Sequence, residues 1–156
     1  MSDAPKRKRL WLRILLIGLA CAPLVLLYPV KSTVCPAWTI QVVDEGGNPL
    51  RDAFVRQHWQ DYSVESDGHE QDAQTDENGY VSFPERTIRA SYLSRTLGVV
   101  LNGLSLGIHA SYGPSAYILA YGEIVGGKRL EGIADCEEGK PLPKQLVTYV
   151  HDLGYR

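Results

Sequence analysis

The first thirty residues combine a basic cluster with a long apolar run. Lys6–Arg9 are all basic, and Ile14–Val30 comprise 17 residues without a charge. A helix needs roughly 20 apolar residues to cross a bilayer, with about 17 as the lower limit. Residues 10–12 extend the run to that length, provided that Arg13 snorkels toward the headgroups. The pattern therefore predicts one N-terminal transmembrane helix over residues 10–30.

Aromatic residues and charge predict how this anchor is oriented. Trp11 and Tyr28 lie near its two ends, where interfacial aromatic residues are favoured. Basic residues stay on the cytoplasmic side of a membrane, so residues 1–9 are expected to be a cytoplasmic tail. The remainder of the chain is then periplasmic or extracellular, and the lipid bilayer is the first expected partner.

Two other interpretations use the same residues. Ala20-Cys21-Ala22 matches the small-x-small pattern of a signal-peptide cleavage site, although the apolar run continues beyond it. Leu19-Ala20-Cys21 is typical of a lipoprotein signal, in which Cys21 would be lipidated, although Gly18 replaces the usual branched apolar residue. All three alternatives place the following domain outside the cytoplasm.

Beyond the anchor, short segments alternate between apolar and polar residues. This alternation occurs in residues 37–43, around Val55 and Trp59, and in residues 80–83. A period of two is typical of half-buried strands. Residues 60–79 are polar and acidic, which predicts a long loop or an irregular edge hairpin.

The second half of the domain has a less regular pattern. Residues 86–108 admit a short helix, because several apolar residues share one side of it, or a strand, because glycines weaken the helix. Residues 116–121 and 130–136 are expected to be strands. The tail over residues 141–156 is expected to contain a short helix from about Lys144.

Short strands with turn signals between them predict a mainly β chain, with a small antiparallel β-sandwich over residues 35–140. Two turns are distinctive: residues 44–49 (DEGGNP) precede the small Ala53, and residues 75–79 (TDENG) join two strands. With the flanking alternation, residues 37–84 resemble the carboxypeptidase regulatory-like domain. The resemblance implies a transthyretin-like, immunoglobulin-type sandwich that serves as an accessory or interaction module.

Charge separates the two parts of the chain. Six of the 16 Lys and Arg residues but one of the 18 Asp and Glu residues lie in residues 1–31. Residues 32–156 therefore hold ten basic and 17 acidic side chains, a net charge of −7. Binding to DNA or RNA needs a basic face, so a nucleic-acid partner is not expected. A protein or a glycan is the expected partner.

Two of the three cysteines bracket the domain. Cys35 stands at its entrance and Cys136 near its end. In an oxidising compartment such a pair is typical of a structural disulfide, which would close a loop of about 100 residues and contribute up to roughly 4–5 kcal/mol. We expect this pair to be structural rather than catalytic.

Catalytic and metal-binding motifs are not evident, so we expect no cofactor and no catalysis. A small hydrolase using His109 and Ser111 is the alternative, because the two residues fall on one face of a strand. A further alternative is calcium-dependent adhesion, since Asp76, Asn78 and Glu85 match offsets 3, 5 and 12 of an EF-hand-like loop. The turn in residues 75–79 explains the first two residues more simply.

Overall fold

The computed structural model describes residues 4–106, 111–124, 128–137 and 139–152. Within these ranges the chain is mainly β, as predicted, with ten strands and two helices. In chain order the elements are α1 (Ala4–Leu27), β1 (Pro29–Cys35), β2 (Trp38–Val43), β3 (Phe54–Asp61), β4 (His69–Gln74), β5 (Tyr80–Phe83), β6 (Arg86–Ser91), α2 (Tyr92–Leu106), β7 (Pro114–Ile124), β8 (Lys128–Asp135), β9 (Gln145–Val147) and β10 (Tyr149–Asp152).

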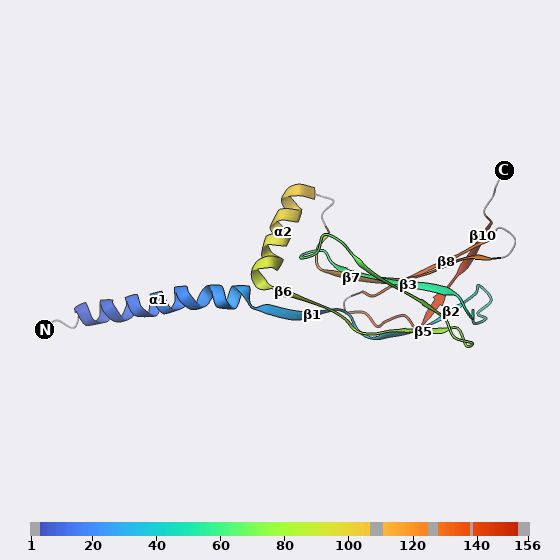
Figure 1. Ribbon diagram of the computed structural model, residues 1–156, viewed down its shortest axis with the longest axis horizontal. Coiled ribbons are helices and arrows are strands. Elements are labelled where there is room, and N and C mark those ends of the chain that lie inside the picture. Colours follow the sequence, from blue (N-terminus) through green and yellow to red (C-terminus); the bar gives the residue numbers. More distant parts are fainter. Residues whose placement is uncertain (1–3, 107–110, 125–127, 138, 153–156) are drawn as a thin grey trace.

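Helix α1 extends away from the strands as a separate rod (Figure 1). It ends at Leu27, and Pro29 then begins β1. The anchor was predicted over residues 10–30. Helix α1 begins before residue 10 and ends before residue 30. Among the described residues, no helix combines the length and the apolar character needed to cross a membrane.

Strands β1 and β6 form a two-stranded antiparallel ladder between α1 and the rest of the domain. Pro29 pairs with Ser91 at one end, and Cys35 pairs with Arg86 at the other. The prediction begins the β-sandwich domain at residue 35, and residues 29–35 form a strand of this separate ladder. Their side chains are mostly exposed or half-buried, and only Val34 and Cys35 are buried.

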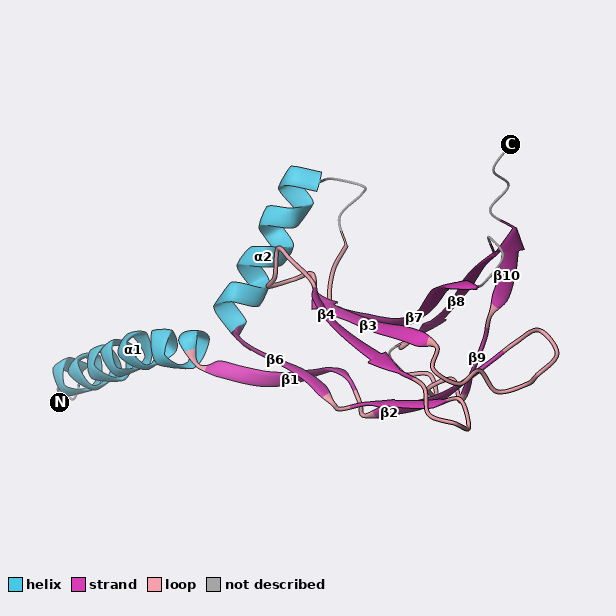
Figure 2. Ribbon diagram, turned by 45° about the vertical axis from the view of Figure 1, so that its right-hand side comes forward, coloured by secondary structure: helices cyan, strands magenta, loops and turns pink. Residues whose placement is uncertain are grey.

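The remaining strands form two sheets. The larger has five strands in the order β10-β8-β7-β3-β4, and the smaller has three in the order β5-β2-β9. Figure 2 shows the two sheets as separate layers. All pairs are antiparallel except β2 with β9, which departs from the antiparallel sandwich that we expected.

The hydrophobic core lies between these two layers. Trp38, Ile40 and Val42 alternate along β2 and are buried, and they meet Val55 of β3 and Ile118 of β7 in one cluster. The Trp38 indole Nε1 donates a 2.8 Å hydrogen bond to the carbonyl oxygen of Pro143, which satisfies its polar group inside the core. The predicted strands around these residues are confirmed.

The structure decides between the alternatives for two segments whose secondary structure the sequence left open. The polar segment 60–79 contains β4, an edge strand paired with β3, so the edge-hairpin alternative is confirmed. Residues 86–108 hold both a strand, β6, and a helix, α2.

The helix expected from Lys144 was wrong. That segment forms β9, which pairs with β2, and β10, which pairs with β8. The side chain of Leu146 enters the core, so tertiary pairing overrides the weak helical pattern of the tail.

Candidate functional site

The structure brings Cys35 and Cys136 together, although about 100 residues separate them in the chain. Both are free thiols, and their side chains interact through a hydrogen bond. Cys35 lies at the end of β1 and is fully buried, whereas Cys136 follows β8 and is partly exposed. Burial raises the pKa of the Cys35 thiol well above its ordinary value, and the contact with Cys136 raises this pKa further.

A guanidinium group lies beside this thiol pair. Arg86 is the ladder partner of Cys35, and its positive charge partly opposes the rise in the Cys35 pKa. Its Nε donates a 2.7 Å hydrogen bond to Oε1 of Gln57, and its side chain stacks 3.9 Å from the centroid of the Trp59 ring. Arg86 thus connects the β1–β6 ladder to the inner face of the five-stranded sheet.

Gln57 is fully buried at this junction. Arg86 satisfies its amide oxygen, whereas its Nε2 has no hydrogen-bond partner in the part of the chain that the structure describes. Leaving a buried amide hydrogen unpaired costs about 1–3 kcal/mol, so this position is destabilising on its own. The sequence offered no signal for this polar cluster, because Gln57 occupies an inward position of an otherwise apolar alternation.

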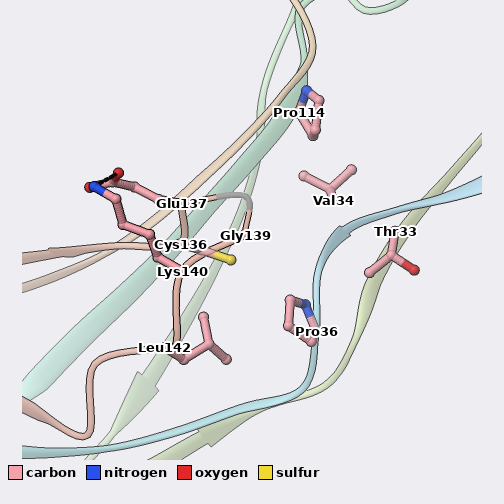
Figure 3. Close-up of a pocket in the computed structure, with 9 residues that line it drawn as sticks. All are labelled: Thr33, Val34, Pro36, Pro114, Cys136, Glu137, Gly139, Lys140 and Leu142. Atoms are coloured by element: carbon pink, nitrogen blue, oxygen red, sulfur yellow. Dashed lines mark ion pairs between the residues drawn. The ribbon is translucent and has the colours of Figure 1, made fainter.

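A pocket of about 190 Å³ opens next to the thiol pair. Figure 3 shows the Cys136 sulfur pointing toward Pro36 within it, with Val34 and Leu142 on the surrounding walls. Lys140 and Glu137 form an ion pair at its rim.

The raised pKa of Cys35 disfavours attack by this thiol, in nucleophilic catalysis and in thiol–disulfide exchange alike. The thiolate is the reactive form of cysteine, and a raised pKa keeps Cys35 protonated at neutral pH. The side chains of Cys35 and Cys136 interact, as partners of the predicted disulfide must. The disulfide itself stays a prediction.

The outer face of the five-stranded sheet is a second candidate surface. Its strands alternate so that Phe54 of β3, Ile133 of β8 and Tyr149 of β10 point away from the core and are exposed. Phe54 stacks on its cross-strand neighbour Tyr121, with 6.3 Å between the ring centroids. We call this set of outward residues on β3, β7, β8 and β10 the outer face.

Charged groups border the outer face along β4. Arg56 donates two hydrogen bonds to the Asp72 carboxylate, at 2.7 and 2.9 Å, and its guanidinium lies 5.5 Å from the centroid of the Tyr121 ring. The hydrogen bonds from Arg56 lower the pKa of Asp72 below its ordinary value. The surface therefore combines aromatic rings with an arginine, and both residue types are enriched at protein interfaces.

The residues of the calcium alternative are not brought together. Asp76 caps its own turn, because its Oδ1 accepts hydrogen bonds from the backbone N–H groups of Asn78 (2.9 Å) and Tyr80 (2.8 Å). Glu85 follows β5, at the opposite end of that strand, and accepts a 2.9 Å hydrogen bond from the Thr33 hydroxyl. Across the described ranges, no cluster of three or more His, Cys, Asp or Glu side chains is placed to hold a metal ion.

His109 of the hydrolase alternative lies outside the described residues, and Ser111 is exposed. Two other histidines pack against aromatic rings. His58 stacks on Tyr117 with 4.9 Å between centroids, and His69 stacks on Trp59 at 5.4 Å. These two imidazoles thus have packing partners that explain their positions.

Comparison with protein families, curated proteins and solved structures adds no further constraint. No family model, no curated protein and no solved structure matches this chain.

The residues predicted to mark the anchor all lie on α1 or directly after it. Trp11, Arg13 and Tyr28 are exposed. So are the large apolar residues between them, and α1 holds more exposed large apolar side chains than any other element of the described ranges. These exposed apolar residues are Leu12, Ile14, Leu15, Leu16, Ile17, Leu19, Leu24, Val25, Leu26 and Leu27.

Proposed function

We propose that this chain is a membrane-attached accessory module that presents a β domain on the extracytoplasmic side and binds a protein or a glycan without catalysis. The observation that carries the proposal is the exposure of α1, which projects from the domain (Figure 1). Its apolar side chains are exposed on every side. Each large apolar side chain transferred out of water contributes about 1.5–3 kcal/mol. A lipid environment supplies that transfer along the apolar part of α1.

The distribution of apolar residues around α1 supports lipid rather than a protein groove. Successive residues of a helix are 100° apart, so four consecutive residues cover all sides. Ile14–Ile17 and Leu24–Leu27 are two such runs, and all eight side chains are exposed. A helix that docks in a groove needs one apolar stripe, whereas a helix immersed in lipid is apolar all round.

Charge supports the proposed orientation. The basic cluster Lys6–Arg9 precedes the apolar part of α1, and the positive-inside rule keeps such clusters cytoplasmic. The domain that follows has a net charge of −7, and acidic residues do not oppose export.

The interactions of the two sequence motifs support the proposed carboxypeptidase regulatory-like, transthyretin-like character. The Thr75 hydroxyl donates a 2.6 Å hydrogen bond to the Leu50 carbonyl and accepts a 2.9 Å bond from the Ala53 amide. Gly79 has φ = +76°, and a Cβ there would lie 2.8 Å from the Val42 carbonyl oxygen. The two turns thus contact each other through the residues that carry the resemblance.

The attachment can be tested by fractionating cells that express the full chain with an N-terminal tag. We expect the protein in the membrane fraction after alkaline washing, and we expect protease added from the outside to digest the β domain while sparing the tag. The double variant Leu16→Lys and Leu19→Lys should release the protein. Ile133→Lys changes an equally apolar exposed residue of β8 and serves as the matched control.

Recovery of the unsubstituted chain in the soluble fraction would overturn the membrane part of the proposal. Equal release by Ile133→Lys would show that α1 has no special role.

For binding, we propose that the outer face is the contact surface. The variant Phe54→Ala with Tyr121→Ala removes its central aromatic pair, and we expect a several-fold loss of any partner that co-purifies with the chain from native membranes or of any glycan retained on an array. Tyr80→Ala removes an exposed aromatic residue of β5, in the other sheet, and is the matched control. Retention of every ligand by the double variant would exclude the outer face.

A further inference from the structure

The apolar side of helix α2 is exposed, and two of its residues, Leu97 and Leu101, also line an open pocket beside the β3–β4 connection. Leu93, Leu97, Val100, Leu101 and Leu104 follow helical spacing and form one face, which we call the α2 apolar face. All five are exposed, and Leu104 reaches 80%. A helix that served only to complete the fold would place this face against the core.

The opposite side of α2 holds the helix on the domain through polar and small residues. Arg95 forms an ion pair with Asp61, at 2.5 Å, and donates a 2.6 Å hydrogen bond to the Ser32 hydroxyl. Asn102 donates a 2.6 Å hydrogen bond to the carbonyl oxygen of Tyr62. The polarity of α2 is thus inverted relative to an ordinary surface helix.

Gly98 lies on this inner side, between Arg95 and Asn102. A Cβ at Gly98 would lie 1.7 Å from the Ser63 carbonyl oxygen, so the helix backbone approaches the β3–β4 connection as closely as only glycine permits. The close approach and the two polar contacts fix which side of α2 faces outward.

The position of α2 in the fold indicates what covers the apolar face. Pro29, the first residue of β1, pairs with Ser91, the last residue of β6, so α2 begins beside the point where α1 ends. The two helices also contact each other. In both ribbon views α2 runs steeply across the direction of α1 (Figures 1 and 2). A helix placed across the outer end of an anchor lies along the membrane surface.

We propose that α2 is an interfacial helix whose apolar face enters the outer leaflet of the membrane to which α1 attaches the chain. The proposal rests on the proposed attachment through α1. Interfacial helices bury an apolar face at the boundary between headgroups and acyl chains.

The outward side of α2 suits this environment because it carries no charge, the single charged residue of the helix being Arg95 on the inner side. Tyr92 is exposed at the first turn, where an aromatic residue suits the headgroup region. Lys31, which also forms an ion pair with Glu85, and Arg89 are ladder partners in the strands that follow α1 and precede α2. With two contacts, α1 and α2, the membrane would hold the domain in one orientation.

The test uses the full chain in phosphatidylcholine–phosphatidylglycerol vesicles, with the photoreactive residue p-benzoylphenylalanine replacing Leu16, Leu101 or Ile133 in turn. Leu101 and Ile133 are both 60% exposed, so Ile133 is a matched control on the β domain. After irradiation, adducts are identified by mass, and flotation reports whether the protein is bound to the vesicles.

We expect lipid adducts at positions 16 and 101, several-fold more abundant than at position 133. Flotation with a lipid adduct at position 16 but none at position 101 would overturn the role of α2 and leave the attachment through α1 intact. Adducts between two copies of the chain at position 101 would overturn it in favour of a helix-mediated dimer. A chain that does not float would refute the proposed attachment as well.

Discussion

Among single residues, Asp61 has the most demanding environment. Its side chain is 1% exposed, and Arg95 from α2 neutralises it while the Ser63 amide donates a 3.1 Å hydrogen bond to it. A buried charge without a partner is strongly destabilising, whereas removing both partners can be nearly neutral. Removing Arg95 alone should therefore destabilise the protein more than removing the charges of both Arg95 and Asp61.

We expect Arg95→Met to lower the free energy of unfolding by about 3–5 kcal/mol, because Asp61 would stay buried and charged. Urea unfolding of the full chain in a mild detergent, followed by tryptophan fluorescence, measures the change. Arg51→Met breaks an exposed ion pair with Asp52 and should change stability by less than about 1 kcal/mol. Adding Asp61→Asn to Arg95→Met should restore part of the loss. Equal losses of stability in Arg95→Met and Arg51→Met would contradict the prediction.

Asp72 predicts a dependence on pH. Hydrogen bonds from Arg56 lower its pKa in the folded protein, so its contribution to stability is present above the unfolded pKa of about 3.9 and is lost as the pH falls through the lower folded value. We expect Asp72→Asn to lose less stability than the unsubstituted chain on acidification below about pH 4. Urea unfolding over a pH series tests this, with Asp67→Asn as the control, and parallel acid profiles for all three proteins would count against it.

At the scale of elements, α2 and β9 illustrate how tertiary contacts decide structure. Gly98 and Gly103 weaken α2 as an isolated helix, yet Gly98 permits its close approach to Ser63. Strand β9 is only three residues long, but it completes the smaller sheet and contributes Leu146 to the core.

Gly98→Ala should detach α2 from the β domain, because the added methyl group would collide with the Ser63 carbonyl. Limited proteolysis of the full chain in detergent should then cut faster around α2, and hydrogen exchange of its amides should increase several-fold. Gly103→Ala is the control, since its methyl group would meet the movable end of the Tyr112 side chain. The same cleavage rate in both variants would show that the close approach is unimportant.

Leu146→Ala should cost about 2–5 kcal/mol, because Leu146 is 2% exposed within the core. Its neighbour Val147 is 41% exposed, so Val147→Ala should cost far less. Chemical unfolding of the two variants compares them directly. Similar losses would mean that the C-terminal segment does not pack as β9 in solution.

For the whole molecule, Cys35 and Cys136 bring together two segments of the β domain that lie about 100 residues apart in the chain. Oxidation would join their sulfur atoms, with two protons and two electrons passing to an oxidant such as the disulfide of an oxidoreductase. The structure supports this step only through the contact between the two thiols.

We expect protein isolated from its native compartment to contain this disulfide and to lose up to roughly 4–5 kcal/mol of stability on reduction, the value for a loop of about 100 residues. Thermal unfolding with and without dithiothreitol measures the difference, and mass spectrometry identifies the bridge. Cys21→Ser should leave the response to reductant unchanged, whereas Cys136→Ser should abolish it. Free thiols at both Cys35 and Cys136 would refute the prediction.

The local pattern of the sequence was sufficient to predict the mainly β class, strands β2, β3 and β5 and the turn at residues 75–79. These elements follow from alternation and from residues that favour turns, which act over a few neighbouring positions. The basic cluster and the apolar run likewise predicted a distinct N-terminal helix, which the structure shows as α1.

Only the tertiary structure decided the features that depend on distant partners. The β1–β6 ladder, the pairing of β9 with β2 and the direction in which the α2 apolar face points all join segments that lie far apart in the chain. Hydrophobic periodicity identifies which residues of α2 share a side but not whether that side faces the core or the surroundings. The ion pair between Arg95 and Asp61 and the close approach at Gly98 settle that choice, because they hold the opposite side against the domain.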